Sequence, residues 1–212
     1  MTESILAAVG SLLAPPLCWG CRGSARTGEP LCLACRTSLR PLGPLPVALA
    51  GVETWAPFAY EGVARELVRA LKYRGATRIA DAMAAQVVAR APPELLGPSA
   101  LVPVPLHPAR ARRRGFDQAA LLAQAVGRRV ARPVAACLVR GGRPAAQVGR
   151  DRRDRLAGVA GNVWASDRAP LHATLVDDVA TTGATLAACA AALRAAGAGE
   201  VKALAYARTL GR

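Results

Sequence analysis

Short apolar runs alternate with amphipathic stretches along most of this chain. Apolar residues recur at helical spacing between residues 63 and 71, with charged residues on the opposite side, and helices are also predicted over 79–89, 116–130 and 184–196. Apolar runs between these helices predict buried strands. The strands are Ala100–Val104, Val134–Val139, Ala173–Val176 and Val201–Ala207. Helices that alternate with such strands predict an α/β fold, a mostly parallel sheet with helices on both faces.

Two stretches depart from this pattern. Residues 14–46 hold four cysteines and many Pro and Gly without a long periodic run, and residues 140–163 are rich in Gly and Arg, which is typical of a mobile surface segment. We therefore predict two units joined by a proline-rich linker. The first, 1–46, contains a short helix over Ile5–Leu13 and the cysteines, and the second, 50–212, is the α/β domain.

The composition agrees with a folded protein. Of the 212 residues, 52% are hydrophobic and 20% are charged, which excludes a disordered chain. No apolar run approaches the roughly 18 residues of a membrane-spanning helix, so no membrane insertion is expected. The run Ile5–Leu13 lacks the basic start and small-residue cleavage site of a signal peptide. We expect a cytoplasmic protein.

Positive charge is concentrated in one part of the sequence. The net charge is +14, and the segment from Leu106 to Arg155 contains thirteen arginines but only three aspartates. Such a block suits a polyanion, either nucleic acid or a phosphate-rich small molecule.

The cysteines form two closely spaced pairs. Each pair has the CxxC spacing that brings two thiolates onto one tight turn, and two such turns can complete a tetrahedron around Zn²⁺. Because all four ligands are cysteines, the site is closed and its role is structural, in a small zinc ribbon; disulfides are the alternative. The predicted ligands are Cys18, Cys21, Cys32 and Cys35. Cys137 and Cys189 are interpreted as ordinary buried residues.

A strand–turn–helix signal lies between Leu175 and Leu186. The apolar strand leads to Asp177 and Asp178 at its carboxyl end, where ligands bind in open α/β sheets. The small residues that follow open a helix, whose first N–H groups form an anion site. Three threonine hydroxyls add further donors, and Gly183 allows close approach of a phosphate.

Adjacent carboxylates beside a phosphate site need a partner. Two sugar hydroxyls or Mg²⁺ would satisfy them, so the pattern indicates a ribose 5-phosphate with free hydroxyls near Mg²⁺. Helix capping is the alternative. It accounts for one Asp or one Thr, but not for two Asp, three Thr and a Gly in this order.

Other basic residues have two interpretations each. Arg110, Arg112, Arg113 and Arg114 follow the apolar strand 100–104, so they either bind a pyrophosphate or form a solvated turn. Lys72 either contacts a phosphate or complements a helix C-terminus. A further group either closes over the ligand or follows a nucleic-acid backbone: Arg150, Arg152, Arg153 and Arg155.

The segment DDVATTGAT resembles the phosphoribosyl-diphosphate (PRPP) motif of type I phosphoribosyltransferases, and the whole chain resembles the ComF family of competence-associated proteins. The chain departs from that family at Asp117, where Asn is usual, and at Gly158. The matching marks are CWGC and CLAC, Ala70–Tyr73, Val102–Leu106, Arg114–Gln118, Gln147, Arg155 and the PRPP motif.

The resemblance implies a type I phosphoribosyltransferase fold with an N-terminal zinc ribbon, and PRPP bound with Mg²⁺. By the same resemblance, Asp177 and Asp178 hold the ribose hydroxyls, and Thr181–Thr185 wrap the 5-phosphate. The implied PRPP contacts are Asp177, Asp178, Val179, Ala180, Thr181, Thr182, Gly183, Ala184 and Thr185. The pyrophosphate-loop candidates are Pro103, Val104, Pro105, Arg114 and Lys72.

Two functions follow. The first is transfer of phosphoribose to an acceptor with release of pyrophosphate. The second is a non-catalytic module that holds single-stranded DNA beside other competence proteins. Neither the acceptor nor the oligomeric state follows from the sequence.

Overall fold

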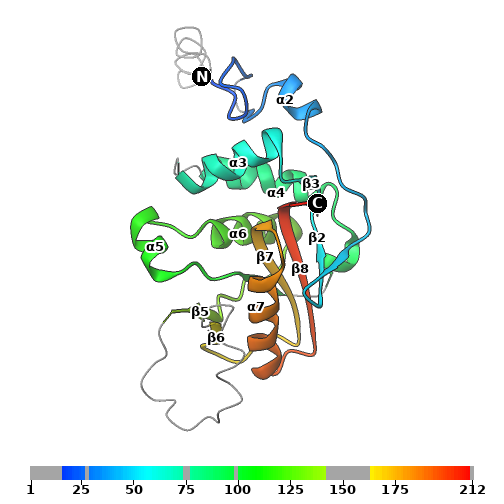
Figure 1. The fold of residues 1–212 in the computed structure, drawn as a ribbon, viewed down its shortest axis with the longest axis vertical. Coiled ribbons are helices and arrows are strands. Elements are labelled where there is room, and N and C mark those ends of the chain that lie inside the picture. Colours follow the sequence, from blue (N-terminus) through cyan, green and yellow to red (C-terminus); the bar gives the residue numbers. More distant parts are fainter. Residues whose placement is uncertain (1–15, 27–28, 74–76, 98–99, 142–162, 211–212) are drawn as a thin grey trace.

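A computed structural model describes residues 16–26, 29–73, 77–97, 100–141 and 163–210 (Figure 1). Its helices are α2 (Leu33–Thr37), α3 (Gly62–Tyr73), α4 (Thr77–Val88), the 3-10 helix η1 (Pro93–Leu95), α5 (Pro108–Arg114), α6 (Gln118–Val130) and α7 (Ala184–Ala195). Its strands are β1 (Val47–Leu49), β2 (Val52–Trp55), β3 (Phe58–Ala59), β4 (Ala100–Pro103), β5 (Leu138–Arg140), β6 (Val163–Ala165), β7 (His172–Ala180) and β8 (Glu200–Arg208).

The main sheet has the order β1-β2-β8-β7-β4, and β3 pairs with the end of β8. Only the β1–β2 hairpin is antiparallel among the pairs of this sheet in the described ranges; β2, β3 and β7 run parallel to β8, and β4 runs parallel to β7. The predicted α/β fold with a mostly parallel sheet is confirmed. A separate antiparallel pair, β5–β6, lies beside the sheet.

Helices cover both faces of the sheet, as predicted (Figure 1). On one face α3, α4 and α6 bury an aliphatic layer against β7 and β8, because their apolar residues fall on one side of each helix. On the other face α7 packs with the β5–β6 pair. Since the strands of the parallel core share one direction, the carboxyl ends of β4 and β7 lie at the same edge.

Several predicted boundaries were wrong. The strand predicted over 173–176 extends through Ala180, so both aspartates of the motif lie inside β7. The strand predicted over 134–139 is displaced to β5, and Val134 forms only an isolated bridge with Leu101. The helix predicted from Phe116 begins at Gln118, because Asp117 caps it. The short helix α5 and the strands β1, β2, β3 and β6 were not predicted.

The cysteine segment packs on the helical face rather than standing apart. Its buried side chains, Cys18, Leu31, Cys35 and Leu39, belong to the same core as α3 and α4. The stretch predicted as a linker is also hydrogen-bonded to the α/β domain, since the Leu42 N–H donates to the Pro57 carbonyl at 2.8 Å. The division of the chain near residue 46 stays a prediction.

Two predicted segments lie outside the described residues: the helix over Ile5–Leu13 and most of 140–163. In the ranges that the structure describes, none of the helices has both the length and the apolar character needed to cross a bilayer.

Candidate functional site

The two aspartates of the motif come from one strand but serve opposite faces of the sheet. Successive side chains of a strand alternate in direction. Asp178 contacts Lys72 of α3 on one face, so alternation directs Asp177 to the other face, that of α7. There burial, and after it the charge of Asp177, raises the pKa of Cys189. Carboxylates are thus presented on both sides of the carboxyl end of β7.

Asp178 is the most enclosed charged group of this site, with 4% of its surface exposed. The Lys72 ammonium lies 2.7 Å from Asp178 Oδ2, in an ion pair that joins the end of α3 to the central strand. This contact lacks hydrogen-bond geometry, and within the described residues Oδ2 has no hydrogen-bond partner. Among the described contacts, the charge of Asp178 is thus balanced by the Lys72 ammonium rather than by hydrogen bonds to its Oδ2.

The surroundings of Asp177 oppose its ionisation. Burial and the neighbouring Asp178 carboxylate raise the pKa of Asp177 well above its ordinary value, although the Asp178 N–H and Lys72 act in the opposite direction. The Asp178 N–H donates to Asp177 Oδ1 at 2.7 Å. Two carboxylates this close cannot both ionise cheaply without a further cation or donor.

The turn after β7 exposes backbone donors. In the described part of the chain, the N–H groups of Thr181, Thr182 and Gly183 make no hydrogen bond, and the side chains of Thr181 and Thr182 are exposed. They precede the first turn of α7, where the helix dipole favours an anion. Thr182 Oγ1 accepts from the Ala184 N–H, the first of α7, at 3.4 Å. The arrangement can receive a phosphate.

Gly183 is required by packing as well as by conformation. Its φ is +81°, in the left-handed region, and a Cβ at this position would lie 2.7 Å from Leu49 Cβ and 2.8 Å from the Leu49 carbonyl carbon. The sequence suggested that this glycine admits a phosphate. The structure shows that it admits the backbone of β1.

The predicted pyrophosphate loop follows β4 at the same edge of the sheet. Pro103 and Val104 lie beside Val176, and the Val104 N–H donates to the Val176 carbonyl at 2.9 Å. The Leu106 N–H donates to Asp117 Oδ2 at 3.1 Å, while Oδ1 of the same residue caps α6. Asp117 therefore holds the loop after Pro105 against α6, a role that sequence reasoning missed.

Arg114 is fixed between two helices. Its guanidinium donates to Gln118 Oε1 at 2.9 Å and lies 5.3 Å from the centre of the Tyr73 ring, next in sequence to Lys72. Its Nε is buried without a hydrogen-bond partner among the described residues. The structure therefore brings both basic candidates, Lys72 and Arg114, together at the end of α3. Lys72 and Arg114 are far apart in the sequence, so no sequence pattern predicted that they lie near each other.

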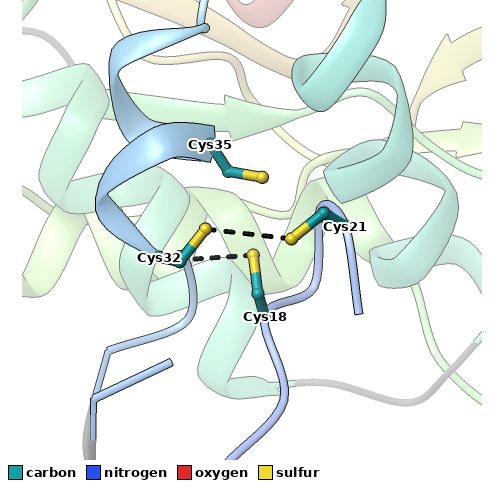
Figure 2. A group of neighbouring side chains, drawn as sticks. All are labelled: Cys18, Cys21, Cys32 and Cys35. Carbon is teal, nitrogen blue, oxygen red and sulfur yellow. Dashed lines mark hydrogen bonds between the residues drawn. The ribbon is translucent and has the colours of Figure 1, made fainter. Parts of the chain in front are cut away.

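The four predicted cysteine ligands converge (Figure 2). Their sulfur atoms all lie within 4.8 Å of one another, and Cys21 Sγ is 3.8 Å from Cys32 Sγ. The edge of a ZnS₄ tetrahedron with bonds of about 2.3 Å is about 3.8 Å. The cysteines are free thiols rather than disulfides. Four thiols in this arrangement can bind a metal such as zinc.

Local backbone geometry builds the cysteine cluster. The Cys18 N–H donates to the Gly23 carbonyl at 2.7 Å, which closes the first knuckle, and Cys32 stands at the start of α2, which carries Cys35. The Cys32 N–H donates to Cys18 Sγ at 3.3 Å.

The electrostatics of this cluster favour bound cations. Burial opposes ionisation of Cys18, but the N–H groups of Cys21, Cys32 and Gly20 outweigh it and lower the pKa of Cys18 to about 6. Burial and the three neighbouring thiols raise the pKa of Cys35. One thiolate therefore forms readily, whereas a second needs a compensating positive charge, which a metal ion would supply.

Some predicted residues lie outside the described ranges. These are Gln147, Arg150, Arg152, Arg153 and Arg155.

Comparisons with known proteins give distant structural similarity. Glutamine PRPP amidotransferase from B. subtilis, solved with ADP and GMP, matches with a TM-score of 0.41 and 16% identity over 65% of this chain and 30% of that one. A structure described as the allosteric regulatory enzyme of purine biosynthesis matches with a TM-score of 0.37 and 18% identity, over 73% of this chain and 26% of that one. Neither the protein-family models nor the curated proteins give a match. The chain thus spans less than a third of either solved protein.

Proposed function

We propose that this chain binds PRPP together with Mg²⁺ and transfers the phosphoribosyl group to an acceptor. In this reaction the bond between the anomeric carbon and pyrophosphate breaks, pyrophosphate leaves with the electron pair, and the acceptor nucleophile bonds to the same carbon and loses its proton. The observation that carries the proposal is the end of β7. There the buried Asp178 carboxylate, ion-paired with Lys72 at 2.7 Å, lies beside a turn whose N–H donors make no hydrogen bond with any described residue.

The ribose part of the ligand would lie over the aspartate pair. Hydroxyl donors at the two carboxylates would stabilise their charged forms, and the Lys72 ammonium, 2.7 Å from Asp178 Oδ2, already supports the charge of Asp178. The 5-phosphate would accept from the N–H groups of Thr181, Thr182 and Gly183 and from the hydroxyls of Thr181, Thr182 and Thr185, while Val179 and Ala180 end the strand and Ala184 begins the helix on either side of the turn.

The diphosphate part would lie at the loop after β4. Pro103, Val104 and Pro105 offer no free N–H there, because proline has none and the Val104 N–H is bonded to Val176, so the positive charges of Arg114 and Lys72 would hold the diphosphate. Mg²⁺ bound with the ligand would neutralise part of the diphosphate charge and make it a better leaving group. The residues fit such a cation, because carboxylate oxygen is its preferred protein ligand.

The cysteine cluster has a separate, structural role in this proposal. Four thiolates leave no open position on zinc, so the metal would hold the segment against α3 and take no part in the transfer. The more specific proposal that the chain is a ComF-type protein associated with DNA uptake rests on the sequence motifs alone.

The direct test measures ligand binding and product. Calorimetry with PRPP and Mg²⁺ should show saturable binding, and a pyrophosphate-release assay with a panel of nitrogen nucleophiles should identify turnover. Failure of PRPP to bind at millimolar concentration would refute the site. Binding without pyrophosphate release for any nucleophile would favour a non-catalytic PRPP-binding protein.

A second candidate function is single-stranded DNA binding, favoured by the surface of α5. Arg110, Arg112 and Arg113 are exposed and make no ion pair with any described residue. Affinity for DNA should then fall linearly with salt on a log–log plot, with a slope of about 0.7 per phosphate neutralised. Replacing these three arginines with Ala should lower that slope by about two. An unchanged slope would show that α5 makes no contact with the nucleic acid.

A further inference from the structure

Arg140, which neither the motifs nor the family resemblance singled out, is a partly buried cation without a counter-ion in the described structure. It is the last residue of β5 and pairs with Val163 of β6. Its Nε is enclosed and has no hydrogen-bond partner among the described residues, and no carboxylate described by the structure lies within ion-pair distance of it. A charge held in this way is costly unless an anion meets it.

Some of the other partly buried cations have a carboxylate partner. Lys72 has Asp178 at 2.7 Å, and Arg129 has Asp81 at 3.2 Å. Arg140 is also of intermediate exposure but, like Arg114, meets no carboxylate in the described ranges.

Packing on two sides places the end of β5 near the proposed ligand site. Leu138 of β5 and Cys189 of α7 belong to one buried core on the α7 face of the sheet. The residue after Arg140, Gly141, packs on the start of α5: a Cβ at Gly141 would lie 3.0 Å from Pro108 Cγ. Pro108 directly follows the loop that leaves β4. Arg140 therefore ends a strand that lies between α7 and the segment that follows the β4 loop.

We propose that Arg140 binds the diphosphate group of the ligand, from the face of the sheet opposite Lys72. This proposal rests on the proposed function and deepens it. The planar guanidinium suits two phosphate oxygens at once, and its enclosed Nε fixes the stem of the side chain while the terminal N–H groups would donate to the ligand. Lys72 and Arg140 would then act from opposite faces of the same strand end, Lys72 on Asp178 and Arg140 on the leaving group.

The experiment separates the two halves of the ligand. Calorimetry with Mg²⁺ would measure PRPP, inorganic pyrophosphate and ribose 5-phosphate on the full chain, for wild type, Arg140→Ala, Arg140→Lys and the control Arg168→Ala. Arg168 is exposed in the segment after β6, so its replacement removes the same charge without touching the site. Thermal melts verify that each variant is folded.

We expect Arg140→Ala to bind pyrophosphate and PRPP about ten- to a hundredfold more weakly, as for loss of charged hydrogen bonds. Its affinity for ribose 5-phosphate should change less than about twofold, and Arg140→Lys should recover part of the pyrophosphate affinity. Equal losses for both fragments, or unchanged pyrophosphate affinity, would overturn the role of Arg140. Absence of PRPP binding by the wild type would instead refute the proposed function itself.

Discussion

The cysteine cluster and the end of β7 are both sites where like charges gather, but they are built in different ways. All four cysteines fall within eighteen residues, and short-range hydrogen bonds close their knuckles. At the end of β7 the two aspartates are neighbours in sequence, whereas Lys72, Leu49 and the β4 loop belong to distant segments that pack around them. A site made of one segment can be recognised from spacing alone. A site made by packing depends on every element that reaches it.

The two regions nevertheless depend on the same core. Gly20, inside the first knuckle, lies against Cys35 and α3: a Cβ there would be 2.9 Å from Cys35 Sγ and 3.2 Å from Val63 Cγ1. The other end of α3 carries Lys72, the partner of Asp178. Disturbance of the metal cluster should therefore reach the ligand site through α3.

The largest effect is expected from removing a metal ligand. Cys18→Ser or Cys35→Ser should lose the single zinc ion per chain, because three thiolates no longer close the tetrahedron, and should lower the free energy of unfolding by more than about 3 kcal/mol. Metal analysis and chemical denaturation measure both quantities.

The control for this change is Cys137→Ala, a buried cysteine outside the cluster, which should keep its zinc. Zinc-free wild-type protein, or a disulfide found by mass spectrometry, would contradict the metal site. The PRPP affinity of Cys35→Ser, compared with that of the wild type, would show whether loss of the metal changes the ligand site at the other end of α3.

The next effect concerns the aspartate pair. Asp177→Asn combined with Asp178→Asn should weaken PRPP binding at least about a hundredfold, since two charge-assisted hydrogen bonds are lost. Calorimetry measures the affinity, and circular dichroism verifies the fold. The exposed Asp167→Asn is the matched control. A double variant with wild-type affinity would remove the aspartates from the site.

A smaller effect is expected at the turn. Gly183→Ala should cost about 2–4 kcal/mol of stability, because it combines a left-handed φ with a clash against Leu49. Gly51→Ala separates the two causes: its φ is +79°, but nothing lies within 4 Å of the added carbon, so about 1 kcal/mol is expected. Equal losses of stability for both variants would show that Leu49 does not constrain the turn.

The smallest effect is the pH dependence of ligand affinity. The pKa of Asp177 is raised in the folded protein, so between the ordinary aspartate pKa and the raised one the folded state binds more protons than the unfolded state. The free energy of unfolding of the ligand-free protein therefore falls as pH rises between these two pKa values. A ligand that needs the charged carboxylate binds more tightly as pH rises. Calorimetry between about pH 5 and 8 should show this rise, and Asp177→Asn should flatten it. A flat wild-type profile would contradict the raised pKa.

The sequence alone determined the parts of this protein that depend on local spacing. The 3.6-residue period located α3, α4, α6 and α7, the CxxC pairs identified the metal cluster, and the carboxylates and small residues between β7 and α7 marked the candidate anion site. Each signal lies within about twenty residues, so chain geometry by itself constrains what the residues can form.

Tertiary structure decided what meets these local units. Strands β1–β3 are too short to show a period. Strands β2 and β3 form because β8 offers them an edge, and β1 forms by pairing with β2. The pairing of Lys72 with Asp178 and the packing of Gly183 on Leu49 join residues more than a hundred positions apart. Such contacts depend on the order of strands and the faces that helices cover, which are properties of the whole core and leave no periodic trace in the sequence.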